Sequence, residues 1–227
     1  MSLFAGRIRA VTFDVGHTLI EPRDSVGNTY SEIAARHGRP GLSPAELDRR
    51  FLKVLQACGG AVNTRADWEE IVDDTFGDLI TPPPSQTFFP ELFERFARAS
   101  EWRIYDDVLP TLEELARRGF RLGIISNWDD RLRPLLAALD LASHFEVTMI
   151  SAEFGCSKPE REIFESAAQL FRLLPAEILH VGDNWNADVE GARAAGFRSV
   201  QIARGSPAGD DRVASLLELE AVVARFG

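Results

Sequence analysis

Short runs of apolar and β-branched residues recur along the chain, and stretches with helical spacing separate most of them. The runs span residues 8–13, 121–126, 145–150, 178–182 and 199–203. Strands of a parallel sheet are covered by helices on both faces, so their sequences are almost continuously apolar. The alternation of such runs with helical patterns predicts an α/β fold with a Rossmann-like, parallel, five-stranded sheet as its core.

Local signals mark where some of the predicted helices begin and end. Val108, Leu112 and Leu115 share one helical face, and the following Gly119 can close that helix in the left-handed conformation. Ser157 precedes Glu160 by three residues, with a proline between them. This spacing predicts a capping box at the start of another helix.

Residues 22–102 break the alternation, because they contain helical patterns and no convincing strand. The patterns cover residues 44–57, 66–79 and 89–99. Large apolar side chains recur there at helical spacing, which favours the packed centre of a small bundle over a cofactor site. They are Phe51, Leu55, Trp68, Ile71, Phe76, Phe93 and Phe96. We expect an α/β core formed by residues 1–21 and 103–227, and an inserted α-helical domain formed by residues 22–102.

Polar residues follow the predicted strands at the ends where ligands bind in open α/β sheets. Asp14 ends the first run, Ser126 and Asn127 end the second, Lys158 precedes a helix, and Asp183 and Asp188 follow the strand at 178–182. A carboxylate at a strand end often caps a turn, and if Asp14 were the only such residue, we would assign it that structural role. Several polar groups on one sheet edge instead predict a site.

The types of these residues indicate a site for a metal ion and a phosphate. Asp14, Asp183 and Asp188 offer the hard oxygen ligands that Mg²⁺ prefers, with waters completing the shell. Lys158 would offset the crowded negative charge and keep Asp14 ionised as a covalent nucleophile. Ser126 and backbone N–H groups would bind phosphoryl oxygens.

The ordered set resembles the four motifs of the haloacid dehalogenase-like hydrolase superfamily. The local sequences are Phe13-Asp14-Val15-Gly16-His17-Thr18-Leu19, Ile125-Ser126-Asn127-Trp128-Asp129, Ser157-Lys158-Pro159 and Gly182-Asp183-Asn184. The resemblance implies that Asp14 and Lys158 are catalytic and that Ser126 and Asn127 bind substrate. It also implies that Asp14, Asp183, Asp188 and the Gly16 carbonyl hold Mg²⁺, and that residues 22–102 form a helical cap.

Gly16 departs from the pattern that the resemblance implies. Most phosphatases of this superfamily have a second aspartate at that position, where it acts as general acid and base. A glycine can offer its carbonyl to a metal ion but can neither protonate a leaving group nor activate water. Three residues are candidates for a role that Gly16 cannot fill. His17 could replace the missing acid or base, and Arg23, near the predicted domain crossing, could contact a substrate anion. Lys53, on a predicted helix, could form a Schiff base in a phosphonate-cleaving enzyme.

The expected function is that of a hydrolase with an aspartate nucleophile and Mg²⁺, acting on a small phosphorylated metabolite and slowed by Gly16. The alternatives are a haloacid- or phosphonate-cleaving enzyme, and a catalytically impaired module that binds Mg²⁺ and phosphate for regulation. A phosphonate-cleaving enzyme would need a lysine directed at Asp14, for which Lys53 is the candidate. A dehalogenase is disfavoured by Asp183, because the resemblance implies that dehalogenases work without a metal.

Composition argues against nucleic-acid and membrane partners, and the expected partner is a small-molecule substrate. The 227 residues carry a formal net charge of −10 with no cluster of Lys or Arg, which argues against nucleic acid. No apolar run approaches the ~20 residues that span a bilayer, so no membrane partner is expected. Two widely separated cysteines and an N-terminus unlike a signal peptide predict a cytoplasmic protein.

Overall fold

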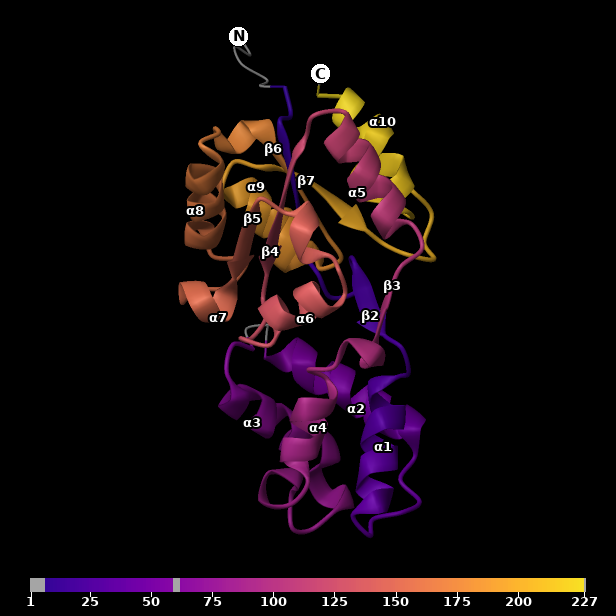
Figure 1. Cartoon of the computed structure of the whole chain (residues 1–227). Coiled ribbons are helices and arrows are strands. Elements are labelled where there is room, and N and C mark those ends of the chain that lie inside the picture. Colours follow the sequence, from indigo (N-terminus) through magenta and orange to yellow (C-terminus); the bar gives the residue numbers. More distant parts are fainter. Residues whose placement is uncertain (1–6, 59–61, 227) are drawn as a thin grey trace. The chain divides into compact units, whose positions relative to one another are not determined.

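The computed structural model describes residues 7–58 and 62–226, and the chain forms two compact units (Figure 1). Unit one contains Met1–Glu21, Ile104–Asn127 and Leu139–Gly227, and unit two contains Pro22–Arg103 and Trp128–Ala138. Residues 128–138 were expected in the core domain and group here with the helical residues. Residues 1–6 and 227 of the predicted core domain lie outside the described residues.

Unit one is built on a parallel sheet with the strand order β5-β4-β1-β6-β7-β8. The strands are β1 (Ala10–Phe13), β4 (Arg121–Ser126), β5 (Val147–Ile150), β6 (Ile178–Gly182), β7 (Arg198–Ile202) and β8 (Arg212–Val213). This confirms the predicted α/β fold class, with six strands where five were predicted. The additional strand β8 has two residues, which is too short to produce an apolar run.

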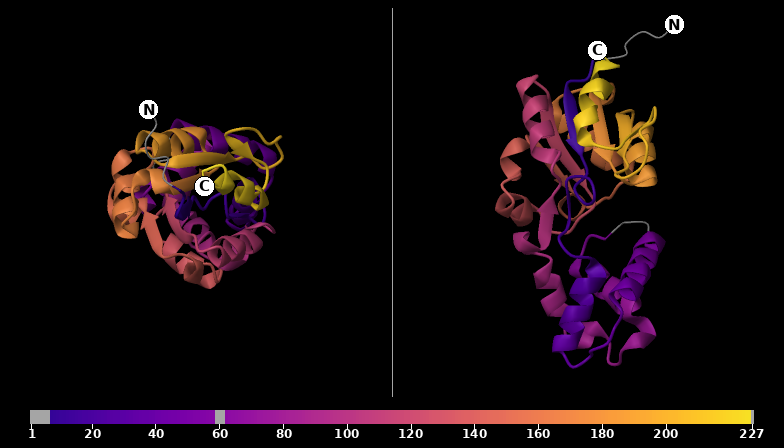
Figure 2. Two further views of the ribbon diagram at one scale, coloured as in Figure 1. Left: turned by 90° about the horizontal axis from the view of Figure 1, so that it is seen from above. Right: turned by 90° about the vertical axis from the view of Figure 1, so that its right-hand side faces the viewer.

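Helices cover both faces of this sheet (Figures 1 and 2). The α-helices of unit one are α5 (Val108–Arg117), α7 (Ser151–Phe154), α8 (Arg161–Phe171), α9 (Gly191–Ala194) and α10 (Leu219–Ala224). The buried faces of α8 and α9 pack with residues of β1, β4, β5 and β6 in one hydrophobic cluster. The helices α5 and α10 lie side by side on the other face. Apolar burial on both faces explains why the strand sequences are so uniformly hydrophobic.

The predicted capping box at Ser157 is wrong, because α8 begins only at Arg161 with Glu160 in the capping position. The backbone at Lys158 is engaged elsewhere: its N–H donates to Asn127 Oδ1 at 2.8 Å, and its carbonyl accepts from Asn127 Nδ2 at 2.9 Å. A side chain from a distant part of the chain therefore holds the backbone just before α8. Gly119 does adopt the left-handed conformation after α5, with φ of 84°.

Unit two contains five α-helices among the described residues. They are α1 (Val26–Arg36), α2 (Pro44–Ala57), α3 (Arg65–Phe76), α4 (Phe89–Arg95) and α6 (Leu132–Ala138). A hydrophobic cluster that includes Tyr30, Phe76 and Phe88 forms the shared core of α1, α2, α3 and α4. Two three-residue strands, β2 (Ile20–Pro22) and β3 (Trp102–Ile104), pair where the chain passes between the units. No helix of the described ranges combines the length and the apolar character required to cross a bilayer.

A buried ion pair joins residues 128–138 to the helices of unit two. Arg131 and Asp129 form a bidentate pair, and the side chain of Asp129 is 2% exposed. The Arg131 guanidinium also lies 3.6 Å from the centre of the Phe93 ring and donates to the Phe93 carbonyl at 2.7 Å. Trp68 donates its indole N–H to Asp129. The loop after β4 is thereby fixed to α3 and α4.

Replacing Arg131 by methionine should destabilise the protein by about 3–5 kcal/mol, because it leaves the Asp129 carboxylate buried without its countercharge. The measurement is the urea midpoint of unfolding. The matched control is Arg161→Met, which removes an exposed pair with Glu165 and should change the midpoint little. Equal midpoints for the two variants would show that the Asp129–Arg131 pair contributes no more than a surface pair.

Candidate active site

Three strand ends of unit one meet at the centre of the sheet. Phe13 at the end of β1 pairs with Ile124 of β4 and with Val181 of β6. Asp14 and Asp183 directly follow β1 and β6, and Ser126 is the last residue of β4. The parallel register therefore brings two carboxylates and a hydroxyl to the same edge, where open α/β sheets bind ligands.

Asp14 is held in place through one of its two carboxylate oxygens. Ser126 Oγ donates to Asp14 Oδ1 at 2.9 Å, and Lys158 Nζ donates to the same atom at 2.7 Å. Both side chains belong to buried residues, and Asp14 itself is only 9% exposed. The two donors leave Asp14 Oδ2 as the oxygen available for a substrate or a cation.

Lys158 connects Asp14 to Asp188. Its ammonium lies 2.6 Å from Asp188 Oδ1, and the residue is 2% exposed. Burial alone would lower the pKa of Lys158, but the carboxylates of Asp14 and Asp188 together raise it. Lys158 is therefore a fixed positive charge between two acids, and Asn127 fixes its backbone by the two hydrogen bonds described above.

Asp188 packs against the backbone of the strand end. Its Oδ2 accepts the Asn184 N–H at 2.9 Å. A Cβ atom on Gly182 would lie 2.2 Å from Asp188 Cγ, so this position requires glycine. Burial alone would raise the pKa of Asp188, but Lys158 and a hydrogen bond from His180 lower it.

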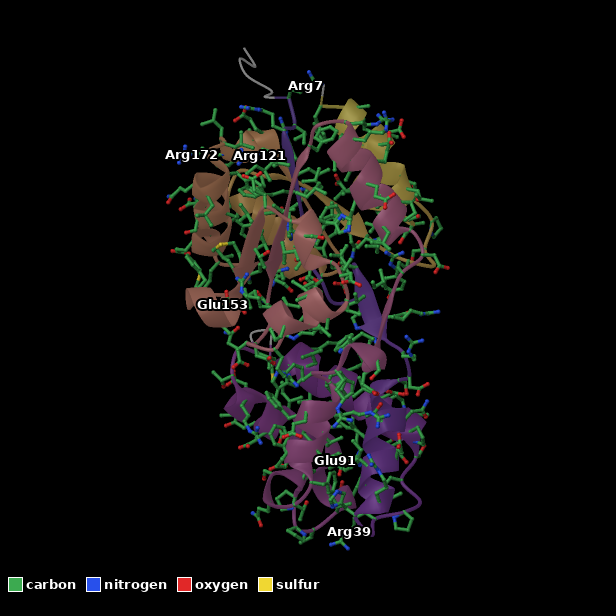
Figure 3. All side chains as sticks on the ribbon, in the orientation of Figure 1. Arg7, Arg39, Glu91, Arg121, Glu153 and Arg172 are labelled. Atoms are coloured by element: carbon green, nitrogen blue, oxygen red, sulfur yellow. The ribbon has the colours of Figure 1, made fainter. Side chains whose placement is uncertain are left out.

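Carboxylate oxygens of Asp14, Asp183 and Asp188 lie within 4.8 Å of one another. Burial, and then the charges of Asp14 and Asp188, raise the pKa of Asp183 to about 8. Glu153, labelled in Figure 3, is by contrast an exposed acid. A cluster of hard oxygen donors with excess negative charge fits a Mg²⁺ ion, which would remove the repulsion.

Gly16 and His17 occupy the turn after Asp14. Gly16 forms an isolated bridge with Ile20, and its φ lies outside the left-handed region. His17 is exposed and has a φ of 54°, which is uncommon for a residue other than glycine. Its role as a substitute acid or base stays a prediction.

The other candidates have different surroundings. Arg23 donates to the backbone carbonyls of Ser100 and Trp102, at 3.0 and 3.4 Å, and so fastens the crossing between the units. Lys53 is exposed on α2. The position of His180 inside a strand predicts a packed, hydrogen-bonded histidine, and the structure confirms this. Sequence reasoning missed Thr12 and the link from His180 to Asp188; the signal was a polar residue at a buried position of each of two paired strands.

Comparison with known proteins agrees with the motifs. The family model of the haloacid dehalogenase-like hydrolases matches residues 8–196. The chain belongs to the haloacid dehalogenase-like hydrolase family. Human haloacid dehalogenase-like hydrolase domain-containing protein 3 is 33% identical over 208 residues, which cover 86% of this chain and 82% of the human protein.

Two further matches concern proteins named as phosphatases. Phosphoserine phosphatase of Thermus thermophilus is 39% identical over 190 residues, covering 80% of this chain and 67% of that protein. A crystal structure of a HAD phosphatase from Thermococcus onnurineus superposes with a TM-score of 0.68 at 27% identity, covering 95% of this chain and 98% of the other. This haloacid dehalogenase-like hydrolase therefore shares its fold and most of its length with known phosphatases.

The raised pKa of Asp183 predicts how pH affects the stability of the hydrolase without metal. An unfolded aspartate ionises near pH 3.9, whereas folded Asp183 holds its proton to about pH 8. The folded state binds more protons between these values, so the contribution of Asp183 is present below about pH 4 and is lost as pH rises toward 8.

We expect the Tm of the wild type in a chelator to fall relative to Asp183→Asn as pH rises from about 5 to 8, because asparagine does not ionise. Added Mg²⁺ should remove the difference in slope by stabilising the ionised carboxylate. Thermal unfolding at several pH values, with and without Mg²⁺, measures this. If Tm changes with pH in the same way for both proteins in chelator, the raised pKa assigned to Asp183 is contradicted.

Proposed function

We propose that this chain is a Mg²⁺-dependent phosphatase that acts on a small phosphorylated metabolite through an aspartyl-phosphate on Asp14. The single observation that carries the proposal is the environment of Asp14. Lys158 and Ser126 both hold its Oδ1, and Asp183 and Asp188 lie within 4.8 Å. The phosphatase names of two relatives support the same substrate class.

Asp14, Asp183, Asp188 and the Gly16 carbonyl would hold the cation, which would neutralise negative charge on the transferring phosphoryl group. Asp14 Oδ2 attacks phosphorus, and the bond from phosphorus to the leaving oxygen breaks. Lys158 orients Asp14, and neighbouring backbone N–H groups would bind phosphoryl oxygens. Ser126 Oγ, which donates its one hydrogen to Asp14 in this structure, would turn to a phosphoryl oxygen when the substrate binds. Water then cleaves the aspartyl-phosphate to release phosphate and free Asp14.

The retained nucleophile favours an enzyme over a regulatory module. A module that only binds Mg²⁺ and phosphate has no need for a carboxylate with one oxygen held by two buried donors. Asp183 disfavours a metal-independent dehalogenase. The tests below distinguish the proposed phosphatase from a regulatory module and from a dehalogenase.

The first test uses a set of phosphorylated metabolites, assayed with Mg²⁺ and with chelator. Asp14→Asn should abolish turnover while leaving the fold intact, since the amide is a much weaker nucleophile of nearly the same shape. Asp183→Asn should weaken Mg²⁺ binding measured by calorimetry. Unchanged Mg²⁺ affinity in Asp183→Asn would refute the metal site, and full activity in Asp14→Asn would refute the nucleophile.

The second test concerns the missing acid at Gly16. Without a proton donor, the leaving group must depart as its anion, so p-nitrophenyl phosphate should be hydrolysed far faster than an alkyl phosphate. Gly16→Asp supplies the acid and should raise activity on alkyl phosphates by up to about 10²–10⁴-fold. The backbone conformation at residue 16 does not require glycine, because its φ lies outside the left-handed region.

The control is Gly16→Asn, which has nearly the same shape as Gly16→Asp and cannot transfer a proton in the same way. Both variants should be checked for folding and for Mg²⁺ binding first. Suppose that Gly16→Asp folds and binds Mg²⁺ but hydrolyses no alkyl phosphate faster than Gly16→Asn does. The absence of an acid at residue 16 would then not be what limits the reaction. A different bond cleavage or a binding role would then be the better account.

A further inference from the structure

A row of hydrogen bonds lies behind the carboxylates, on the side of the sheet covered by α8. Thr12 Oγ1 of β1 lies 2.9 Å from His180 Nδ1 of β6, and His180 Nε2 lies 3.2 Å from Asp188 Oδ1. Thr12 and His180 are fully buried, and Asp188 is 1% exposed. The row ends at the oxygen that also accepts from Lys158.

The partners of the row determine which nitrogen of His180 carries the proton. Ionised Asp188 is an acceptor only, so His180 Nε2 must donate to it. Thr12 then donates its hydroxyl hydrogen to Nδ1. The competing acceptor for Thr12, the Leu179 carbonyl, is farther away at 3.5 Å. A second buried cation beside Lys158 would be repelled, which disfavours protonation of both nitrogens.

This arrangement accounts for nearly all the acceptor capacity of Asp188. Oδ1 receives His180 and Lys158, and Oδ2 receives the Asn184 N–H. Each carboxylate oxygen has two lone-pair sites, so one site on Oδ2 remains. With three donors on two oxygens, the plane of the carboxylate is fixed.

We propose that His180 is a positioning residue that, oriented by Thr12, locks the Asp188 carboxylate so that one lone pair of Oδ2 remains for Mg²⁺ or its water. The inference rests on the proposed function for the identity of the cation. Partners of this kind, one step removed from a metal, typically change its affinity by about 10–100-fold.

Packing alone offers a simpler role for His180, because its ring contacts Phe164 edge-on at 5.3 Å between centres. Any flat side chain of similar size could make that contact. The two roles differ in what they require: packing requires volume, whereas positioning requires an N–H at the Nε2 site and a hydroxyl at residue 12.

The first experiment observes the tautomer directly in the wild-type protein. Long-range ¹H–¹⁵N correlation NMR in chelator, near neutral pH, distinguishes a protonated Nε2 from a protonated Nδ1, and His180→Gln assigns the signal. We expect His180 to be neutral with the proton on Nε2. A proton on Nδ1, or on both nitrogens, would overturn the inference.

The second experiment measures the Mg²⁺ dissociation constant by calorimetry without substrate. His180→Gln can place an amide N–H near the Nε2 site, whereas His180→Asn is too short to reach Asp188. We expect His180→Asn to bind Mg²⁺ about 10–100-fold more weakly and His180→Gln to retain most of the affinity. Thr12→Ser and Thr12→Val form a second matched pair, in which only the valine variant loses the hydroxyl and should bind more weakly.

The two proposals fail in different ways. Wild-type affinity in His180→Asn and Thr12→Val, alongside weakened binding in Asp183→Asn, would overturn the role of His180 and leave the metal site standing. No Mg²⁺ binding by the wild type would overturn both. If His180→Asn does not fold, the Thr12 pair and the NMR measurement decide the question.

Discussion

The repulsion among Asp14, Asp183 and Asp188 is the constraint to which the rest of the core responds. One carboxylate oxygen of each of these three acids lies within 4.8 Å of the others, and the single positive charge of buried Lys158 offsets only part of their negative charge. The residues around the three acids either reduce this repulsion or hold the acids in place against it. Asn127 holds the backbone of Lys158, and glycine at position 182 leaves space for Asp188. Burial, together with the charges of Asp14 and Asp188, raises the pKa of Asp183.

Much of the core could be predicted because it depends on local patterns. The apolar runs located β1, β4, β5, β6 and β7 to within two residues at each end, and the helical pattern at residues 44–57 matches α2. The motif residues were expected at strand ends, and the parallel register does bring Asp14 and Ser126 together. Their roles in catalysis stay predictions, as does the cytoplasmic location.

The features that sequence reasoning missed depend on partners far away along the chain. Ser157 and Glu160 have the spacing of a capping box, but Asn127 engages the intervening backbone and α8 starts later. The apolar setting of His180 indicates burial, but it does not show that the hydrogen-bond partners of the ring are Thr12 and Asp188. The strands β2, β3 and β8 have two or three residues each, too few to show a period.

Because Trp128–Ala138 groups with the helices of unit two, the helical unit cannot be removed or exchanged as one continuous segment. The chain passes between the units after residues 21, 103, 127 and 138, so unit two is not a single inserted stretch. Excising residues 22–103 would leave Asp129 and Arg131 without Trp68 and Phe93. Exchange of the helical unit between related proteins would therefore have to transfer two segments together, one of which begins directly after Asn127. Variation in the helical unit and in the loop after β4 should consequently be linked during evolution.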